Sequence, residues 1–229
     1  MAYVDGTSNR PRPDPVSASE SSLRADAERN RDQILDAARR LYAAEGLTVS
    51  MAAVAREAGV GKATLSRRFT TKDDLIDAVF ADHMDNYLVV TDECLADPDP
   101  WHGFVHFVYR VCEMQAADRG LADVLTTSFP GATALETRRA QAYSGFVEIV
   151  ERARATNHLT QDFVPADLAI LLLANAGVLS ATASASSAVW RRLVDYMLRG
   201  FANPGAPLPR SPNTLTHEDI ERELHTNTA

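Results

Sequence analysis

The sequence predicts an all-α protein. Along most of the 229 residues, apolar side chains recur at spacings of three and four, and Gly and Pro separate these segments. No run of short strands alternating with turns is present. The 45% hydrophobic content suffices for a sizeable core in one or two domains. Since no stretch approaches the roughly 18 apolar residues of a membrane span and no apolar signal region opens the chain, we expect a cytoplasmic protein.

The first predicted helix runs from about Asn30 to Glu45. Its apolar stripe consists of Ile34, Leu35, Ala38, Leu41 and Tyr42. Gly46 is placed to take the left-handed conformation that ends a helix, with Leu47 as the apolar residue after it. Residues 1–27 are rich in Pro and Ser and lack periodicity, so they are expected to form a disordered tail.

Two short amphipathic helices are predicted next, joined by a Gly-Val-Gly turn. The Ser50 hydroxyl is suited to cap the first, and Gly59 to end it. The second starts near Gly61 or Lys62 and keeps Leu65 and Phe69 on its inner face. Its outward residues are Lys62, Ala63, Thr64, Ser66, Arg67 and Arg68. This pattern is typical of a DNA-binding helix-turn-helix, whose second helix enters the major groove.

Further helices are predicted after this motif. Thr71 to Asp74 resembles a capping box, and the helix that it opens is expected to continue to about Leu88. The later helices are expected at about 101–117, 120–127, 132–156, 165–181 and 187–201. The Pro- and Gly-rich stretch 203–213 ends the domain.

Charge is distributed unevenly along the chain. The formal net charge is −8, which by itself argues against a nucleic-acid partner. Residues 29–72, however, hold nine basic and four acidic side chains, a local charge of +5. The two lysines of the whole chain, Lys62 and Lys72, lie in this segment. A solvated surface is the alternative interpretation of such a cluster, but its coincidence with the predicted helix-turn-helix favours DNA.

Residues 29–80 resemble the N-terminal domain of the tetracycline-repressor (TetR) family of transcriptional regulators. The order of residues from Val54 to Phe69 matches the family's usual Ile-Ala-x-x-Ala-Gly-Val-Ser-x-x-Thr-Leu-Tyr-x-x-Phe at most positions, and Phe69-x-x-Lys72-Asp73-x-Leu75 follows. Two positions depart from it: Ser66 replaces an aromatic residue and Gly61 replaces a common Ser.

The resemblance implies an N-terminal three-helix helix-turn-helix domain joined to a C-terminal helical ligand-binding and dimerisation domain. We expect a tail at 1–27, the DNA-binding domain at 28–78, the helical domain at 79–202 and a Pro-rich tail at 203–229. The predicted DNA-binding residues are Ser50, Gly61, Lys62, Ala63, Thr64, Ser66, Arg67, Arg68 and Lys72. Of these, Lys62 or Arg67 is expected to read base edges, and Ser50, Thr64, Arg68 and Lys72 to contact phosphates.

Two sites are expected in the helical domain. The last two helices are strongly apolar, which suits a homodimer interface, predicted at Leu168, Leu171, Leu172, Leu179, Trp190, Leu193 and Met197. Aromatic residues and one amide are expected to line a pocket: Trp101, Phe104, Phe107, Val108, Val111, Phe129, Tyr143, Phe146 and Asn175. In both cases, the alternative is that these residues form the core of the monomer.

The expected function is that of a homodimeric repressor that binds a palindromic operator in double-stranded DNA and is released by a small apolar or aromatic ligand, with no cofactor. The alternatives are a regulator that activates or ignores ligands, a helical ligand carrier and an enzyme. Gly59 to Thr64 lacks the spacing and preceding strand of a phosphate-binding loop. His102 and His106 have metal-chelating spacing, but no third ligand is evident, so no metal site is predicted.

Overall fold

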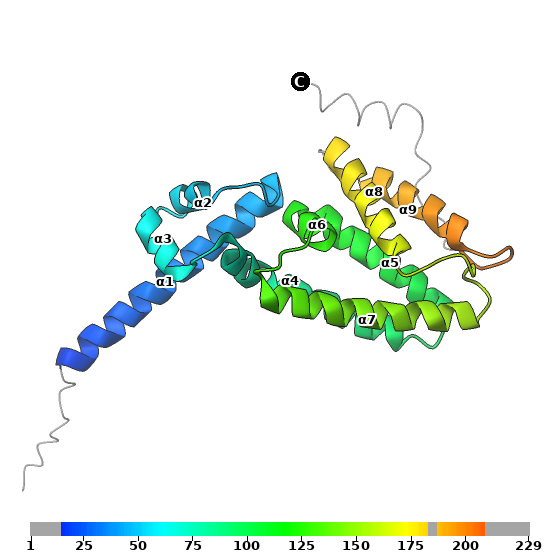
Figure 1. Ribbon diagram of the computed structural model, residues 1–229, viewed down its shortest axis with the longest axis horizontal. Helices are drawn as coiled ribbons and strands as arrows, with labels where there is room; N and C mark the ends of the chain where they lie inside the picture. The colour runs from blue at the N-terminus through cyan, green and yellow to red at the C-terminus, as the bar shows by residue number, and fades with distance from the viewer. Residues whose placement is uncertain (1–14, 183–186, 209–229) are drawn as a thin grey trace, which may run out of the picture.

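The computed structural model describes residues 15–182 and 187–208. Within them the chain is almost entirely helical, with a single isolated β-bridge between Leu159 and Ala202 (Figure 1). The helices are α1 (Pro15–Glu45), α2 (Met51–Glu57), α3 (Lys62–Arg68), α4 (Lys72–Leu95), α5 (Pro100–Ala117), α6 (Arg119–Thr126), α7 (Thr133–Ala155), α8 (Asp167–Ala181) and α9 (Ser187–Phe201). The all-α prediction is therefore confirmed.

The first helix is longer than predicted. It begins at Pro15 instead of about Asn30, so residues 15–27 are helical and not part of a disordered tail. The N-terminal half of α1 extends away from the rest of the molecule (Figure 1). Residues 15–27 show no apolar periodicity, so the sequence pattern gave no helix signal there. Pro is tolerated at a first helical position, and the Ala, Glu and Arg residues that follow favour helix.

Local end signals were predicted correctly in the helix-turn-helix region. The Ser50 hydroxyl accepts a hydrogen bond from the Ala53 amide at 3.2 Å and caps α2. Thr71 and Asp74 form the expected capping box at the start of α4, with N···O distances of 2.8 and 3.1 Å. Gly46 has a φ of +74°, the left-handed conformation expected at the end of α1.

Helix α4 connects the N-terminal domain to the rest of the chain. It packs along α7 and α5, and α8 and α9 lie side by side across α5 (Figure 1). A continuous apolar core joins all of these helices. Residues 203–208 belong to this fold and not to a tail, because the Asn203 amide bonds the His158 carbonyl at 2.7 Å and the Trp101 indole donates to the Pro207 carbonyl at 2.6 Å. The rest of the predicted C-terminal tail lies outside the described residues.

None of the helices in the described ranges combines the length and the apolar character that crossing a membrane requires.

Candidate nucleic-acid interface and pocket

Helix α3 presents polar and basic side chains to solvent. Lys62, Ala63, Ser66, Arg67 and Arg68 are exposed, whereas Leu65 is fully buried on the opposite face. Half-buried Thr64 accepts a hydrogen bond from Arg67 at 3.4 Å. Gly61 is the N-cap and has extended backbone geometry. Apart from half-buried Thr64, the outward side chains predicted from the sequence are therefore exposed to solvent.

The cations of α3 differ from those of α1 in their partners. On α1, Arg39 pairs with Asp36 at 3.0 Å and Arg40 pairs with Glu57 at 3.2 Å. Within the described part of the chain, Lys62, Arg67 and Arg68 have no carboxylate partner. Positive charge that is not neutralised by the protein is available to phosphates or base edges.

The remaining predicted contacts, Ser50 and Lys72, also have structural roles. Ser50 is exposed and caps α2, as described above. Half-buried Lys72 directs its ammonium group to the Leu47 carbonyl. An ammonium group has three donors, so this bond leaves capacity for a phosphate. Sequence spacing alone did not indicate the bond to Leu47.

The Leu47 peptide joins the N-terminal domain to α6. Its amide donates to Asp123 Oδ2 at 2.6 Å, and its carbonyl accepts the Lys72 bond. A Cβ on neighbouring Gly46 would lie 2.6 Å from Asp123 Oδ2. Glycine is thus required at position 46 both by its positive φ and by the close approach of α6.

Aspartates of α4 hold the N-terminus of α7. The Ala132 N-cap provides no side-chain hydrogen bond, and Asp77 accepts from the Leu135 amide at 2.7 Å instead. Asp73 accepts from the Gly131 amide at 3.1 Å. These bonds satisfy free amides at the positive end of α7, so the first turns of α4 and α7 are tied together.

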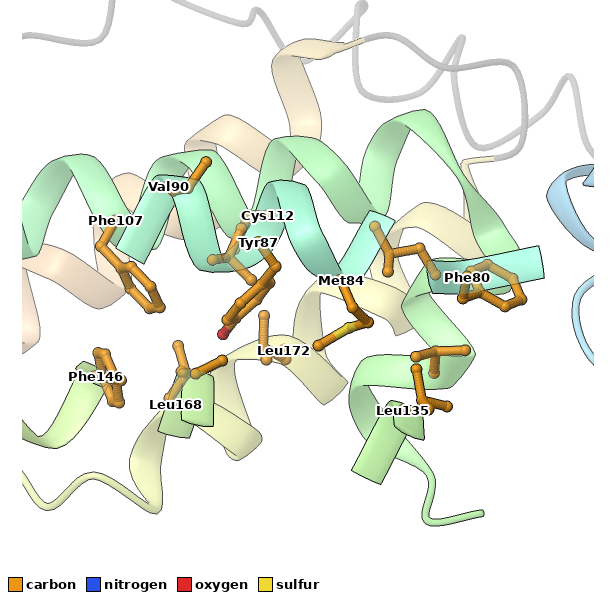
Figure 2. Close-up of a cluster of buried hydrophobic side chains, with 14 of the residues drawn as sticks. Phe80, Met84, Tyr87, Val90, Phe107, Cys112, Leu135, Phe146, Leu168 and Leu172 are labelled. Carbon is orange, nitrogen blue, oxygen red and sulfur yellow. The ribbon is translucent and has the colours of Figure 1, made fainter. Parts of the chain in front are cut away.

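A cavity of about 360 Å³ lies between α4, α7 and α8. This volume falls at the lower end of the range of about 300–1,000 Å³ for small-molecule sites. Its residues are Met84, Tyr87, Leu125, Glu136, Arg139, Ala140, Ala142, Tyr143, Phe146, Pro165, Ala166, Leu168, Ala169 and Leu172. Figure 2 shows that Tyr87 extends from α4 with its hydroxyl toward Leu168 and Leu172 of α8.

Most of the residues predicted to bind ligand lie outside this cavity. Tyr143 and Phe146 line it, with Tyr143 54% exposed. The cavity expected between Trp101 and Phe146 is filled, because Phe107 and Phe104 stack on Phe146 with ring centroids 4.9 and 6.3 Å apart. Val108 and Val111 are buried in the same core, and Phe129 is half-buried in the loop before α7. The structure therefore places these predicted residues in or beside the core and not at this cavity, and the phenylalanines of α5 pack on Phe146.

Trp101 borders a second cavity of about 440 Å³ near the start of α5. Val105, Pro207 and Leu208 supply apolar surface there, beside His102 and His106. His102 Nδ1 lies 2.6 Å from Asp97 Oδ2, and this hydrogen bond lowers the pKa of the Asp97 carboxyl. Among the described residues, no three or more ligating side chains are grouped to hold a metal ion.

Asn175 is fully buried between α8 and α5, away from both cavities. Its Nδ2 donates to Gln115 Oε1 at 2.9 Å and to the Cys112 carbonyl at 3.3 Å. Gln115 in turn donates to the Leu172 carbonyl at 3.4 Å. Asn175 therefore connects two helices within the monomer, and within the described residues its Oδ1 has no hydrogen-bond partner.

The predicted dimer residues are mostly internal. Leu168, Leu171, Leu172 and Trp190 are at most 7% exposed, and Leu179, Leu193 and Met197 are half-buried. The large apolar side chains that face solvent on these helices are Ile170, Leu173 and Tyr196, which are 59%, 57% and 53% exposed. An exposed apolar face of this kind marks an interaction surface. Each of these exposed residues is next in the sequence to a predicted interface residue but points to a different side of its helix.

The chain resembles known regulators. Residues 34–79 match the family described as "Bacterial regulatory proteins, tetR family". Among solved structures, a TetR regulatory protein from Mycobacterium vanbaalenii is 29% identical, with a TM-score of 0.46 over 79% of this chain and 99% of that one. NalD of Pseudomonas aeruginosa, the secondary repressor of the MexAB-OprM multidrug efflux pump, is 18% identical, with a TM-score of 0.56 over 79% and 99%.

A further match is the transcriptional regulator FadR of Bacillus subtilis in complex with stearoyl-CoA. It is 16% identical, with a TM-score of 0.53 over 75% of this chain and 99% of that one. The likenesses to NalD and FadR concern the fold. They support the arrangement of an N-terminal helix-turn-helix domain followed by a helical domain.

Replacing Asn175 by Ala is expected to lower the free energy of unfolding by about 1–3 kcal/mol, because Gln115 is then left without its buried partner. Denaturant titration followed by circular dichroism measures this change. The Ser180→Ala substitution, at an exposed position of the same helix, is the control and should stay within about 0.5 kcal/mol of the parent. Equal stabilities of the two variants would contradict a structural role for Asn175.

Proposed function

We propose that this chain, whose residues 34–79 match the tetR family of bacterial regulatory proteins, is a homodimeric repressor of transcription, not an enzyme, that a small ligand releases from DNA. The observation that carries this proposal is the exposed set of cations on α3, Lys62, Arg67 and Arg68, which pair with no carboxylate of the described residues. Two such helices, related by a two-fold axis, would enter successive major grooves about 34–36 Å apart. The operator is then a palindrome whose half-sites are separated by about one helical turn.

Replacing both Lys62 and Arg67 by Ala is expected to weaken operator binding by about 1–3 kcal/mol for each side chain that bonds a base edge in bidentate fashion. A mobility-shift titration on DNA flanking the coding region measures this change in affinity. Arg110→Ala is the control, since Arg110 lies on α5 beside Glu113. Undiminished binding by the double variant would refute the assignment of α3 as the recognition helix.

The exposed face of α8 and α9 is the proposed dimer interface. Ile170 and Leu173 lie on α8 and Tyr196 on α9, and exposed Ala174 and Gly177 extend the α8 face with small side chains. Small residues allow a second helix to approach closely, and burying the large apolar ones stabilises the interface by about 25 cal/mol per Å². The two α8–α9 pairs would form a four-helix bundle.

Replacing Ile170 and Leu173 together by Glu is expected to convert the dimer to a monomer, because four like charges would meet across the two-fold axis. Sedimentation or light scattering measures the mass, and circular dichroism checks the fold. Val89→Glu changes an equally exposed apolar residue on α4 and should leave the dimer intact. If the double variant remains dimeric, the interface lies on another face.

Helix α4 is the proposed lever between the pocket and the DNA-binding domain. Met84 and Tyr87 line the cavity, and the start of α4 packs on the N-terminal domain through Leu75 and Ile76. The bonds of Asp73 and Asp77 to the start of α7 make the two helices move together. A ligand that favours one position of this pair changes the spacing of the two α3 helices, and hence operator affinity.

A ligand bound in the cavity of α4, α7 and α8 is expected to weaken operator binding by roughly 5- to 150-fold, the usual range of allosteric coupling. A thermal-shift screen of small apolar molecules identifies ligands, and operator titration at saturating ligand measures the coupling. A compound that stabilises the protein through this cavity but leaves operator affinity unchanged would contradict ligand-relieved repression.

A further inference from the structure

The hydroxyl group of Tyr87 opens on the cavity between α4, α7 and α8. Tyr87 is 5% exposed and lines the cavity. Within the described residues its hydroxyl makes no hydrogen bond, and Figure 2 shows it directed toward the α8 side of the cavity. It is not among the fully enclosed polar atoms that lack a partner, so it stays accessible from the cavity. A ligand atom that accepts its hydrogen bond can therefore reach it.

Arg139 supplies positive charge to the same cavity. It lines the wall from α7, and its side chain is 24% exposed. Its Nη1 donates to Glu136 Oε1 at 3.0 Å and to the Thr127 carbonyl at 2.6 Å. Both bonds use Nη1, so Nε and Nη2 remain as donors. The guanidinium is thereby held in place while part of its donor capacity is unused.

Glu136 also lines the cavity, and the protein occupies one oxygen of its carboxylate. Besides Arg139, its Oε1 accepts from the Phe129 amide at 2.7 Å and from the Ser128 hydroxyl at 3.4 Å, whereas its Oε2 accepts no bond within the described residues. Burial raises the pKa of the Tyr87 phenol, and the charge of Arg139 offsets only part of this effect. Tyr87 therefore stays protonated and acts as a donor at neutral pH. The donors of Tyr87 and Arg139 thus outnumber the one unused acceptor oxygen of Glu136.

We propose that the ligand of this cavity is a small carboxylic acid with an apolar body, whose carboxylate accepts hydrogen bonds from the Tyr87 hydroxyl and the Arg139 guanidinium. The body lies against Met84, Leu168 and Leu172. This inference rests on the proposed function, in which the cavity is the effector site. A carboxylate satisfies both donors at once, and the guanidinium compensates its charge.

Other ligand classes fit these groups less well. A hydrocarbon fills the apolar part but leaves the Tyr87 hydroxyl unpaired. An amine can pair with Glu136 Oε2, but it brings a positive charge toward Arg139 and, as ammonium, cannot accept from the two donors. An alcohol oxygen can accept from both donors, but it lacks the charge that strengthens a bond to guanidinium. The expected order of affinity for one chain length is therefore acid, then alcohol, then amine.

Calorimetric titration of the purified dimer with decanoate, decan-1-ol and decylamine tests this order. Tyr87→Phe removes only the hydroxyl and is expected to weaken decanoate binding roughly tenfold or more, with a smaller effect on decan-1-ol. Arg139→Gln should act in the same direction. Tyr42→Phe removes the hydroxyl of another buried tyrosine, on α1 and outside the cavity, and is the matched control, which should bind decanoate as the parent does.

The results separate this inference from the proposed function. Decanoate binding no tighter than that of decan-1-ol, no effect of Tyr87→Phe, or no binding of any of the three would overturn the carboxylate assignment. Operator affinity in the presence of each compound is measured in a separate titration. If decanoate binds as expected but leaves operator affinity unchanged, ligand-relieved repression fails and the assignment of the cavity stands. If another compound releases the operator through this cavity and decanoate does not bind, the carboxylate assignment fails and ligand-relieved repression stands.

Discussion

The backbone N–H and C=O groups of Leu47 set the orientation of the N-terminal domain relative to the rest of the molecule. Asp123 of α6 accepts its amide hydrogen, and Lys72 at the start of α4 donates to its carbonyl. The apolar core is continuous across this junction, but apolar contacts are not directional and tolerate small rotations. The two hydrogen bonds are directional, so they determine the orientation in which α2 and α3 are presented.

Polar bonds hold together α4 and α7, two of the helices that line the cavity. Helix α7 has no side-chain cap of its own and depends on Asp77 of α4 for the amide of Leu135. Further along, Asp85 pairs with Arg138 at 2.6 Å. Helix α8 closes the cavity from the other side through Leu168 and Leu172. A molecule in the cavity would therefore press between a bonded helix pair and a helix held mainly by apolar packing.

Local signals in the sequence were enough to predict the helix-turn-helix region. Ser50, Gly46 and the Thr71 capping box act through neighbours within a few residues, so their roles can be read from short spacings. The start of α1 was missed because its residues show no apolar periodicity. The sequence prediction thus succeeded where structure depends on nearby residues.

The cavity and the exposed face depend on contacts between distant helices. Tyr87 and Arg139 meet at one cavity from α4 and α7, and no motif connects them. The aromatic residues of α5 were expected to surround a space, but stacking of Phe107 on Phe146 fills it. Helix α8 is apolar around most of its circumference, so periodicity did not distinguish Leu172, which is buried, from Leu173, which is exposed.

The close approach of Gly46 to Asp123 restricts how this junction can change during evolution. A larger residue at position 46 would meet the carboxylate and would also have to adopt a positive φ. A smaller residue at position 123 would make room but would leave the Leu47 amide without its acceptor. A single substitution at position 46 or at position 123 is therefore expected to destabilise this junction. In the proposed regulator, operator choice could change through the exposed residues of α3 without any change at this junction.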